Sequence, residues 1–171
     1  ELRRQKKDGT PIDIVFSAAP LQDSEGQISG MVVVIADITQ QKQQAEQVRL
    51  LQSVVVNTND AVVITEAQPI DSDGPRIIYV NEAFTRITGY TLAEVLGKTP
   101  RILQGPKTNR IELAKIRTAL SEWEAVTVEV INYRKNGSEF WNEFSIVPVA
   151  DKTGWYTHWI AVQRDTTGRK Q

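Results

Sequence analysis

Hydrophobic runs near the N-terminus predict two strands joined by a tight turn. The segments 10–20 and 28–37 are rich in apolar residues, and the second is dominated by β-branched ones, which favour strands. The polar loop between them contains Gly26, at the position where a hairpin turn needs a positive φ angle. A β-hairpin is therefore predicted at the start of the chain.

The next stretch, 40–57, has the pattern of a helix. It lacks glycine and proline, and Val48, Leu51 and Val55 recur at helical spacing along one apolar stripe. Thr39 is a plausible N-cap. Such a stripe lets the helix lie on its own domain, or pair with a second copy in a short parallel coiled coil.

Beyond residue 60 the chain contains segments with the periodicity of a strand and segments with the periodicity of a helix. The predicted strands are 61–68, 76–81, 126–133, 140–147 and 157–164, and the predicted helices are 81–90, 91–98, a short one that begins at Thr99-Pro100, and 109–123. Helix 109–123 is expected to bury Ile111, Leu113, Ile116 and Leu120. This order predicts an α+β domain whose five-stranded antiparallel sheet carries helices on one face.

Residues 7–43 align with residues 135–171 without a gap, which indicates one supersecondary unit used twice. The shared residues are mostly turn and corner types, among them Gly9/Gly137, Pro20/Pro148, Asp23/Asp151, Gly26/Gly154 and Asp37/Asp165. We therefore expect residues 1–39 to be the C-terminal strands of a truncated domain, 40–57 to be a linker helix, and 58–171 to be a second domain of the same kind.

Three amide side chains distinguish the second copy from the first. Asn132, Asn142 and Gln163 stand where the first copy has Arg4, Ile14 and Ile35. Alternation leaves the phase of strand 157–164 open, because both of its faces carry apolar groups; we choose the phase that puts the three amides on one apolar face, under the helices. Buried amides need hydrogen-bond partners, and together these match the edge of a flat heterocycle such as an isoalloxazine ring. The alternative is that they bond to loops and to one another, or face solvent.

The opposite face of the same strands is also partly apolar. Its hydrophobic residues are Ile131, Tyr133, Trp141, Val147, Ile160 and Val162. An exposed patch of this kind suggests a docking surface. We expect a homodimer that uses this face and the linker helix, with scattered surface hydrophobic residues as the alternative.

Composition restricts the chemistry of the chain. Its 171 residues include no cysteine and one histidine, His158, which argues against metal clusters and the usual nucleophilic triads. The formal net charge of −1 gives no reason to expect a nucleic-acid partner, and no apolar run suits a membrane span. We therefore expect a non-enzymatic module without membrane contact.

Several motifs together resemble the PAS superfamily, and more narrowly its light-oxygen-voltage (LOV) branch. They are YVNEAFTRITGY, GKTPRILQGPKT, EVINYRKNG, FWNEF and VQRD, spread over about residues 60–170. Residues 7–43 resemble the C-terminal part of another PAS domain. The strings DITQQK and DTTGRK resemble the usual exit into a signalling helix.

The resemblance implies non-covalent binding of FMN or FAD. The residues that match the family's flavin contacts are Gln104, Asn132, Asn142 and Gln163 for the ring and Arg101 and Arg117 for the phosphate. Arg110, two turns before Arg117 on the same helix, could reach the same anion. The alternative for these arginines is surface salt bridging.

The chain departs from the LOV pattern at its centre. Pro100 stands at the position of the photoactive cysteine, Thr99 replaces the neighbouring asparagine, and Ala161 stands where glycine is usual. A flavin–cysteinyl adduct is therefore excluded, which leaves reduction of the flavin, with Trp159 or a tyrosine as a donor. By analogy, rotation of the Gln163 amide would carry the change to the exit at Thr167.

Three functions follow as hypotheses. The first is a flavin-binding sensor of redox state or light, in a larger cytoplasmic signalling protein such as a two-component system, whose output domain lies outside this fragment. The second is a cofactor-free module for dimerisation and signal relay. The third is a site for haem or a small metabolite, although His158 is predicted to point away from the cleft.

Overall fold

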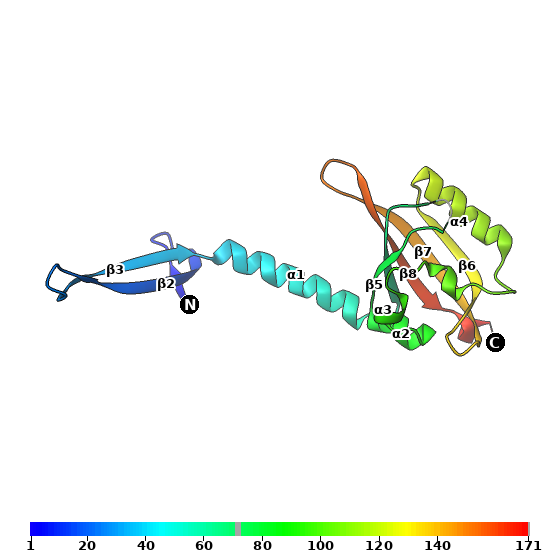
Figure 1. Ribbon diagram of the computed structural model, residues 1–171, viewed down its shortest axis with the longest axis horizontal. Helices are drawn as coiled ribbons and strands as arrows, with labels where there is room; N and C mark the ends of the chain where they lie inside the picture. Colours follow the sequence, from blue (N-terminus) through cyan, green and yellow to red (C-terminus); the bar gives the residue numbers. More distant parts are fainter. Residues whose placement is uncertain (71–72, 171) are drawn as a thin grey trace. The chain divides into compact units, whose positions relative to one another are not determined.

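The computed structural model describes residues 1–70 and 73–170, and the chain divides into two compact units, Glu1–Ser53 and Val54–Gln171 (Figure 1). In the first unit, three antiparallel strands pair in the order β1-β2-β3: β1 (Leu2–Gln5), β2 (Pro11–Gln22) and β3 (Ile28–Asp37). Helix α1 (Thr39–Asn57) follows.

Two expectations for the first unit are corrected. The predicted hairpin carries a third strand, β1, whose polar sequence LRRQ gives no alternating signal and which is held by backbone pairing with β2. Thr39 is the first residue of α1 rather than its cap. Its hydroxyl donates to Asp37 at 2.6 Å and accepts the backbone N–H of Asp13 at 2.9 Å, so it ties the helix to the sheet.

The sheet of the first unit is open to solvent. Its exposed hydrophobic side chains include Phe16, Leu21, Ile28, Met31, Val33, Val34 and Ile35. Of the stripe predicted on α1, Val48 is exposed, while the side chains of Leu51 and Val55 lie outside the described residues.

The second unit is the predicted α+β domain. Its strands are β4 (Ala61–Glu66), β5 (Ile77–Val80), β6 (Val126–Tyr133), β7 (Glu139–Ala150) and β8 (Tyr156–Asp165), in the antiparallel order β5-β4-β8-β7-β6. Its helical segments are α2 (Glu82–Thr88), α3 (Leu92–Val95), η1 (Pro100–Leu103), α4 (Arg110–Glu122) and the short η2 (Thr167–Arg169). Helices α2, α3 and α4 lie on one face of the sheet (Figure 1).

Asn81 connects the first strand of this unit to its first helix. Its side-chain oxygen accepts the backbone N–H groups of Phe84, at 3.1 Å, and of Val62, at 2.9 Å. Its amide also donates to the carbonyl oxygen of Asp60 at 3.1 Å. One side chain therefore caps α2 and holds the beginning of β4 beside it.

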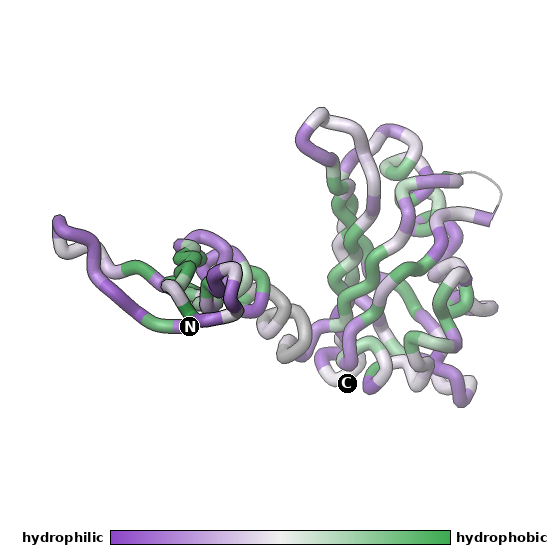
Figure 2. Tube along the Cα trace, turned by 60° about the vertical axis from the view of Figure 1, so that its left-hand side comes forward, coloured by the Kyte–Doolittle hydropathy of each residue, from purple (hydrophilic) through white to green (hydrophobic). Residues whose placement is uncertain are grey.

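Hydrophobic segments follow the strands (Figure 2), and the domain has a buried hydrophobic core. It consists of Ala61, Val63, Ile77, Val80, Phe84, Val95 and Leu103, from β4, β5, α2, α3 and η1. Helix α4 contributes little to it: Ala119 is its one buried residue, and Leu113, Ile116 and Leu120 are half-buried. Under α4 the sheet is therefore not covered by a dense core.

The prediction that Ile111 belongs to the buried stripe of α4 is wrong, because its side chain is 71% exposed. Residues two apart on a helix differ by about 200° in direction. Ile111 and Leu113 therefore cannot face the sheet together.

The acidic side chain of Glu94 generates a testable pH dependence. Its carboxylate accepts from the hydroxyl and backbone N–H of Thr91, both at 3.0 Å, and pairs with Lys135. The hydrogen bond from Lys135, followed by those from Thr91, lowers the pKa of Glu94 from 4.5 to about 2. A pKa lowered by folding contributes stability above the unfolded value, and this contribution is lost as the pH falls from 4.5 toward about 2.

We predict that Glu94→Gln flattens the decline in melting temperature over this acid range, measured by circular dichroism, because the variant has no carboxylate to protonate. Glu122→Gln, at an exposed glutamate on the last turn of α4, is the matched control and should keep the parental decline. Parallel curves for the parent and Glu94→Gln would contradict the prediction.

Candidate functional site

A cavity of about 480 Å³ lies between α4, η1 and the inner face of the sheet. Its volume is within the range of small-molecule sites, about 300–1,000 Å³. The six site residues that the sequence analysis names all line it: Arg101, Gln104, Arg117, Asn132, Asn142 and Gln163. The structure thus brings them together, while their role toward a ligand stays a prediction.

The wall of the cavity carries the three predicted amides on adjacent strands. Asn132 lies on β6, Asn142 on β7 and Gln163 on β8, and their exposed fractions are 5%, 1% and 5%. The assignment of strand faces is therefore confirmed, and the alternative in which these amides face solvent is excluded. Apolar side chains such as Val130 and Trp159 surround them.

The amides bond to one another, as one part of the stated alternative expects, and the pattern leaves one atom unpaired. The amide nitrogen of Asn142 donates to Asn132 Oδ1 at 2.9 Å and to Gln163 Oε1 at 3.1 Å. Both N–H bonds of Asn142 are thereby used. Its oxygen, Oδ1, is the one buried side-chain polar atom without a partner among the described residues. A buried, unpaired acceptor costs about 1–3 kcal/mol, so this site would gain from a ligand that donates a hydrogen bond.

Gln104 is positioned by a loop fixed to β6. The hydroxyl of Thr108 accepts the N–H of Gly105 at 2.9 Å and donates to the carbonyl oxygen of Ile131 at 2.7 Å. The N–H of Lys107 donates to the Tyr133 hydroxyl at 3.1 Å. These contacts fix the loop that follows Gln104, which itself lines the cavity.

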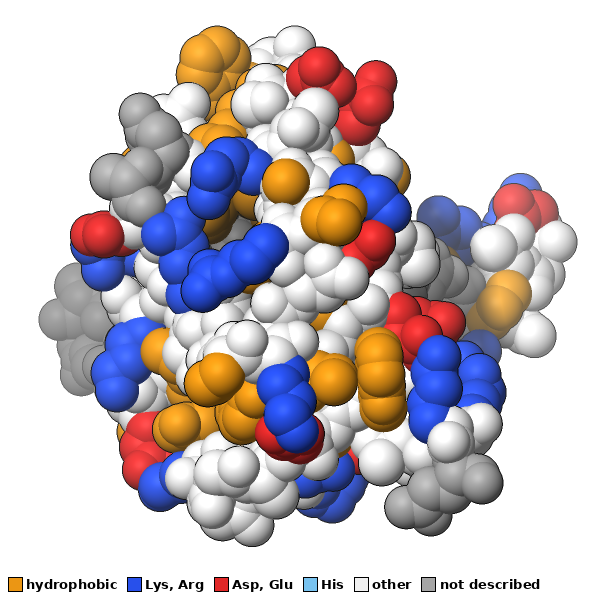
Figure 3. Space-filling view, turned by 90° about the vertical axis from the view of Figure 1, so that its right-hand side faces the viewer, with side chains coloured by type: hydrophobic (Ala, Val, Ile, Leu, Met, Phe, Trp, Pro, Cys, Tyr) orange, Lys and Arg blue, Asp and Glu red, His pale blue; other side chains and the backbone are white. Residues whose placement is uncertain are grey.

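Arginine side chains form the polar part of the rim. Arg101, Arg110 and Arg117 line the cavity and are exposed, and basic side chains gather on the face shown in Figure 3. Within residues 1–70 and 73–170, no ion pair involves Arg110 or Arg117, so the surface salt-bridge alternative is not supported for Arg117. Guanidinium groups clustered in this way suit a phosphate.

The positions that depart from the LOV pattern also border the cavity. Thr99 and Pro100 lie on its rim at the start of η1, and Ala161 lies on its wall. His158 is not among the lining residues, and its Nδ1 is 2.9 Å from the Thr157 hydroxyl. Across the part of the chain that the structure describes, no group of His, Asp and Glu side chains could hold a metal ion.

Trp123 and Tyr156, which stack beside the lining residue Trp159, were not singled out in the sequence. Trp159, on the wall, stacks on Trp123 with ring centroids 5.1 Å apart, and Trp123 stacks on Tyr156 at 4.7 Å. Trp123 terminates α4 with a φ angle of 57°, a conformation that usually calls for glycine. No hydrophobic period identifies a residue in this position.

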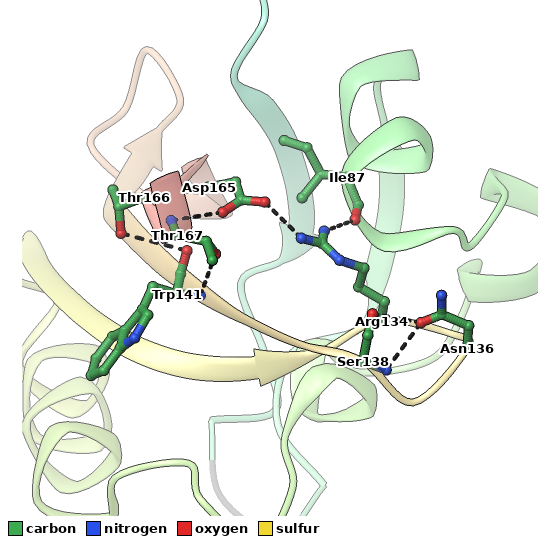
Figure 4. A network of polar contacts seen from close by, with 8 residues as sticks. All are labelled: Ile87, Arg134, Asn136, Ser138, Trp141, Asp165, Thr166 and Thr167. Atoms are coloured by element: carbon green, nitrogen blue, oxygen red, sulfur yellow. Dashed lines mark hydrogen bonds and ion pairs between the residues drawn. The ribbon is translucent and has the colours of Figure 1, made fainter. Parts of the chain in front are cut away.

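Polar contacts hold the segment that follows β8 (Figure 4). Arg134 lies 2.8 Å from the carboxylate of Asp165 and also donates to the carbonyl oxygen of Ile87. The N–H of Trp141 donates to the Thr167 hydroxyl at 3.0 Å. Burial would raise the pKa of Asp165, but hydrogen bonds from Arg134 and Thr167 outweigh it and hold this pKa below its usual value.

The beginning of the domain is attached to strand β8. Arg164 donates from Nε and Nη2 to both carboxylate oxygens of Asp60, at 2.9 and 2.6 Å. This hydrogen bonding lowers the pKa of Asp60. Arg164 directly follows Gln163, so the cavity wall is adjacent to a contact with the segment between α1 and β4.

Fold and motifs agree with comparison to known proteins: the chain belongs to the PAS domain family, which matches residues 1–40 and 59–168. Within that family it is LOV-like. It is 35% identical to a solved structure described as "Flavin Analogue Sheds Light on Light-Oxygen-Voltage Domain Mechanism", with a TM-score of 0.62, over 73% of this chain and 87% of the other.

Curated relatives include signalling proteins. A bacterioopsin transcriptional activator from Halobacterium salinarum is 42% identical over 106 residues, which are 62% of this chain and 16% of the relative. A blue-light-activated histidine kinase from Brucella anthropi is 41% identical over 95 residues, 56% of this chain and 19% of the kinase. The matched region therefore spans less than a fifth of each relative.

The loop that carries Gln104 generates a prediction at Gly105. A Cβ atom there would lie 2.3 Å from Cε2 of the Tyr133 ring, so either the ring or the loop must move. We predict that Gly105→Ala lowers the free energy of unfolding by about 1–3 kcal/mol, the usual cost of overpacking, in urea titrations. Gly168→Ala, where a Cβ meets nothing within 4 Å, is the control and should be near neutral. Equal stability of the two variants would contradict the prediction.

Proposed function

We propose that the second unit binds a flavin, FMN or FAD, non-covalently in this cavity and senses redox state or light without a cysteinyl adduct. One observation carries the proposal: Asn132, Asn142 and Gln163 form a buried amide wall on which Asn142 Oδ1 has no partner. A flat heterocycle with hydrogen-bond donors and acceptors along one edge satisfies such a wall. Similarity to LOV domains supports the same ligand class.

The residues fit this ligand in distinct roles. The three wall amides and Gln104 would contact the polar edge of the ring system, and the apolar wall its faces. Arg101 and Arg117, with Arg110 beside them, would hold the phosphate at the rim. A bound flavin would supply light absorption and one- or two-electron redox chemistry. Because the chain has no cysteine, it offers no thiol to add to the ring.

We further propose that this module works inside a larger cytoplasmic signalling protein, with residues 1–39 as the last strands of a second PAS domain and 40–57 as the linker. The relatives, each far longer than the matched region, support a covalently attached output domain. A two-component protein is the type we expect, since one relative is a histidine kinase. No helix among the described residues is long and apolar enough to cross a membrane.

The proposal predicts that purified or FMN-reconstituted protein has the near-ultraviolet and blue absorbance bands of a flavin and releases the flavin on heating. We expect Asn142→Leu to weaken FMN binding by about 1–3 kcal/mol, roughly 5- to 150-fold in Kd, because the ligand loses a buried partner. Quenching of FMN fluorescence on titration measures the change.

Asn59→Leu is the matched control, since Asn59 is an exposed amide that does not line the cavity, and it should bind FMN as the parent does. A folded parent that stays colourless and ignores both FMN and FAD contradicts the proposed function.

A second candidate function, a homodimeric relay without cofactor, is favoured by the outer face of the sheet. Val147 and Val162 on this face are each 42% exposed, and they lie beside half-buried Ile160 on the paired strands β7 and β8. Apolar side chains gathered on an otherwise polar surface are typical of an interface.

A charge introduced among these apolar side chains tests whether the protein forms a dimer through this face. We predict that the parent is a dimer in light scattering after size exclusion and that Ile160→Glu shifts it toward monomer, because an interface cannot bury an unpaired carboxylate cheaply. Thr118→Glu, at an exposed position of α4 and so on the opposite side of the sheet, serves as control. A parent that is monomeric at high concentration would refute the dimer.

A further inference from the structure

Three aromatic rings form a continuous stack that begins at the cavity wall. The Trp159–Trp123 centroids are 5.1 Å apart and the Trp123–Tyr156 centroids 4.7 Å, and in each pair the ring planes differ by 4°. Rings that lie parallel at these distances are in face contact. The stack joins the strand β8, which carries two of the rings, to the end of α4.

The two outer rings of the stack are more exposed than Trp159. Trp159 is 2% exposed and lines the cavity, while Trp123 and Tyr156 are half-buried. The indole N–H of Trp159 donates to the carbonyl oxygen of Ala67 at 3.1 Å, which fixes this ring against the wall. The stack therefore runs from the ligand cavity toward solvent.

The backbone of Trp123 indicates that the stack is enforced by the fold. Among the described residues, Trp123 is the one non-glycine residue with a positive φ angle, and this conformation costs a bulky side chain about 1 kcal/mol or more. Two stacking contacts, each of about 0.5–1.5 kcal/mol, offset that cost. A helix end that only needed to terminate would be more stable with glycine at this position.

We propose that Tyr156, Trp123 and Trp159 form a path that delivers an electron to a photoexcited flavin in the cavity. The inference rests on the proposed function, since the flavin is the oxidant, and it adds the donor residues and their order. Indole and phenol rings are the side chains of this protein that can be oxidised by one electron, since it has no cysteine. Face contact between the rings favours electron transfer, because electronic coupling falls steeply with distance.

The step balances in electrons and protons. Trp159 would give one electron to the photoexcited flavin, Trp123 would reduce the oxidised Trp159, and Tyr156 would reduce the oxidised Trp123. Tyr156, which is half-buried, would release its phenolic proton to water, so that the positive charge leaves the protein and the electron does not return at once. A dithiol in solution would then give a hydrogen atom to the tyrosyl radical, which restores the phenol and oxidises the dithiol to a thiyl radical.

The test compares FMN-loaded parent protein with Trp123→Phe and Tyr156→Phe. Both variants keep a ring in the stack and remove an oxidisable group. Under continuous blue light, without oxygen and with dithiothreitol, we expect the blue absorbance band to bleach at least roughly tenfold more slowly in both, which corresponds to about 1.4 kcal/mol in barrier. Frozen, illuminated parent should show a tyrosyl radical by electron paramagnetic resonance that Tyr156→Phe lacks.

Trp155→Phe is the matched control, because Trp155 is adjacent to Tyr156, is 71% exposed and belongs to no ring stack within the described residues. It should bleach at the parental rate. Stacking itself is checked without flavin, since two stacked indoles produce an exciton couplet in circular dichroism that Trp123→Phe should abolish.

The possible results distinguish the electron path from the proposed flavin-binding function. If both variants bind FMN and bleach at the parental rate, the electron path is wrong and the proposed function stands. If both variants lose FMN, the stack also shapes the site, and the parent then decides: illuminated parent without a tyrosyl radical would overturn the electron path. If the folded parent binds no flavin, the proposed function and the electron path fail together.

Discussion

The wall of buried amides is the constraint on which the rest of the site depends. Asn142 uses both of its N–H bonds on Asn132 and Gln163, so that its own oxygen has no partner on a wall that is otherwise apolar. Folding alone does not require this arrangement, because the repeated strands of the first unit carry Arg4, Ile14 and Ile35 at the equivalent positions. The scaffold can avoid this cost and a ligand that donates a hydrogen bond would offset it, which supports the proposed binding role.

The strand that carries Gln163 also connects the cavity with both ends of the domain. Arg164 holds Asp60, just before β4, and Asp165 is held by Arg134. Thr167, two residues further on, accepts a hydrogen bond from Trp141 on the neighbouring strand. A change in hydrogen bonding at Gln163 is therefore one residue from the contact that holds the start of the domain and two to four residues from those that hold its exit.

Much of this fold could be predicted from the sequence where a period was clear. The predicted inner face with Asn132, Asn142 and Gln163 is confirmed, although alternation left the phase of β8 open and that phase was chosen to bring the amides together; the helix order was also confirmed. The failures have physical causes. Strand β1 is polar and is defined by backbone pairing alone, and Ile111 was assigned by apolar character against the angular spacing of a helix. The ring stack depends on an unusual φ angle at Trp123, which no local pattern reveals.

The tertiary fold brings Gln104 and the arginines together at one rim. This was anticipated through family resemblance rather than through spacing.

The most direct measurement of the central claim is a ¹H–¹⁵N spectrum of the side-chain amide groups during titration with FMN. The account predicts that the NH₂ signals of Asn132, Asn142 and Gln163 shift and saturate together at one equivalent of FMN, while that of exposed Asn59 stays in place. Unchanged signals from the three buried amides, in a protein that remains folded, would contradict it.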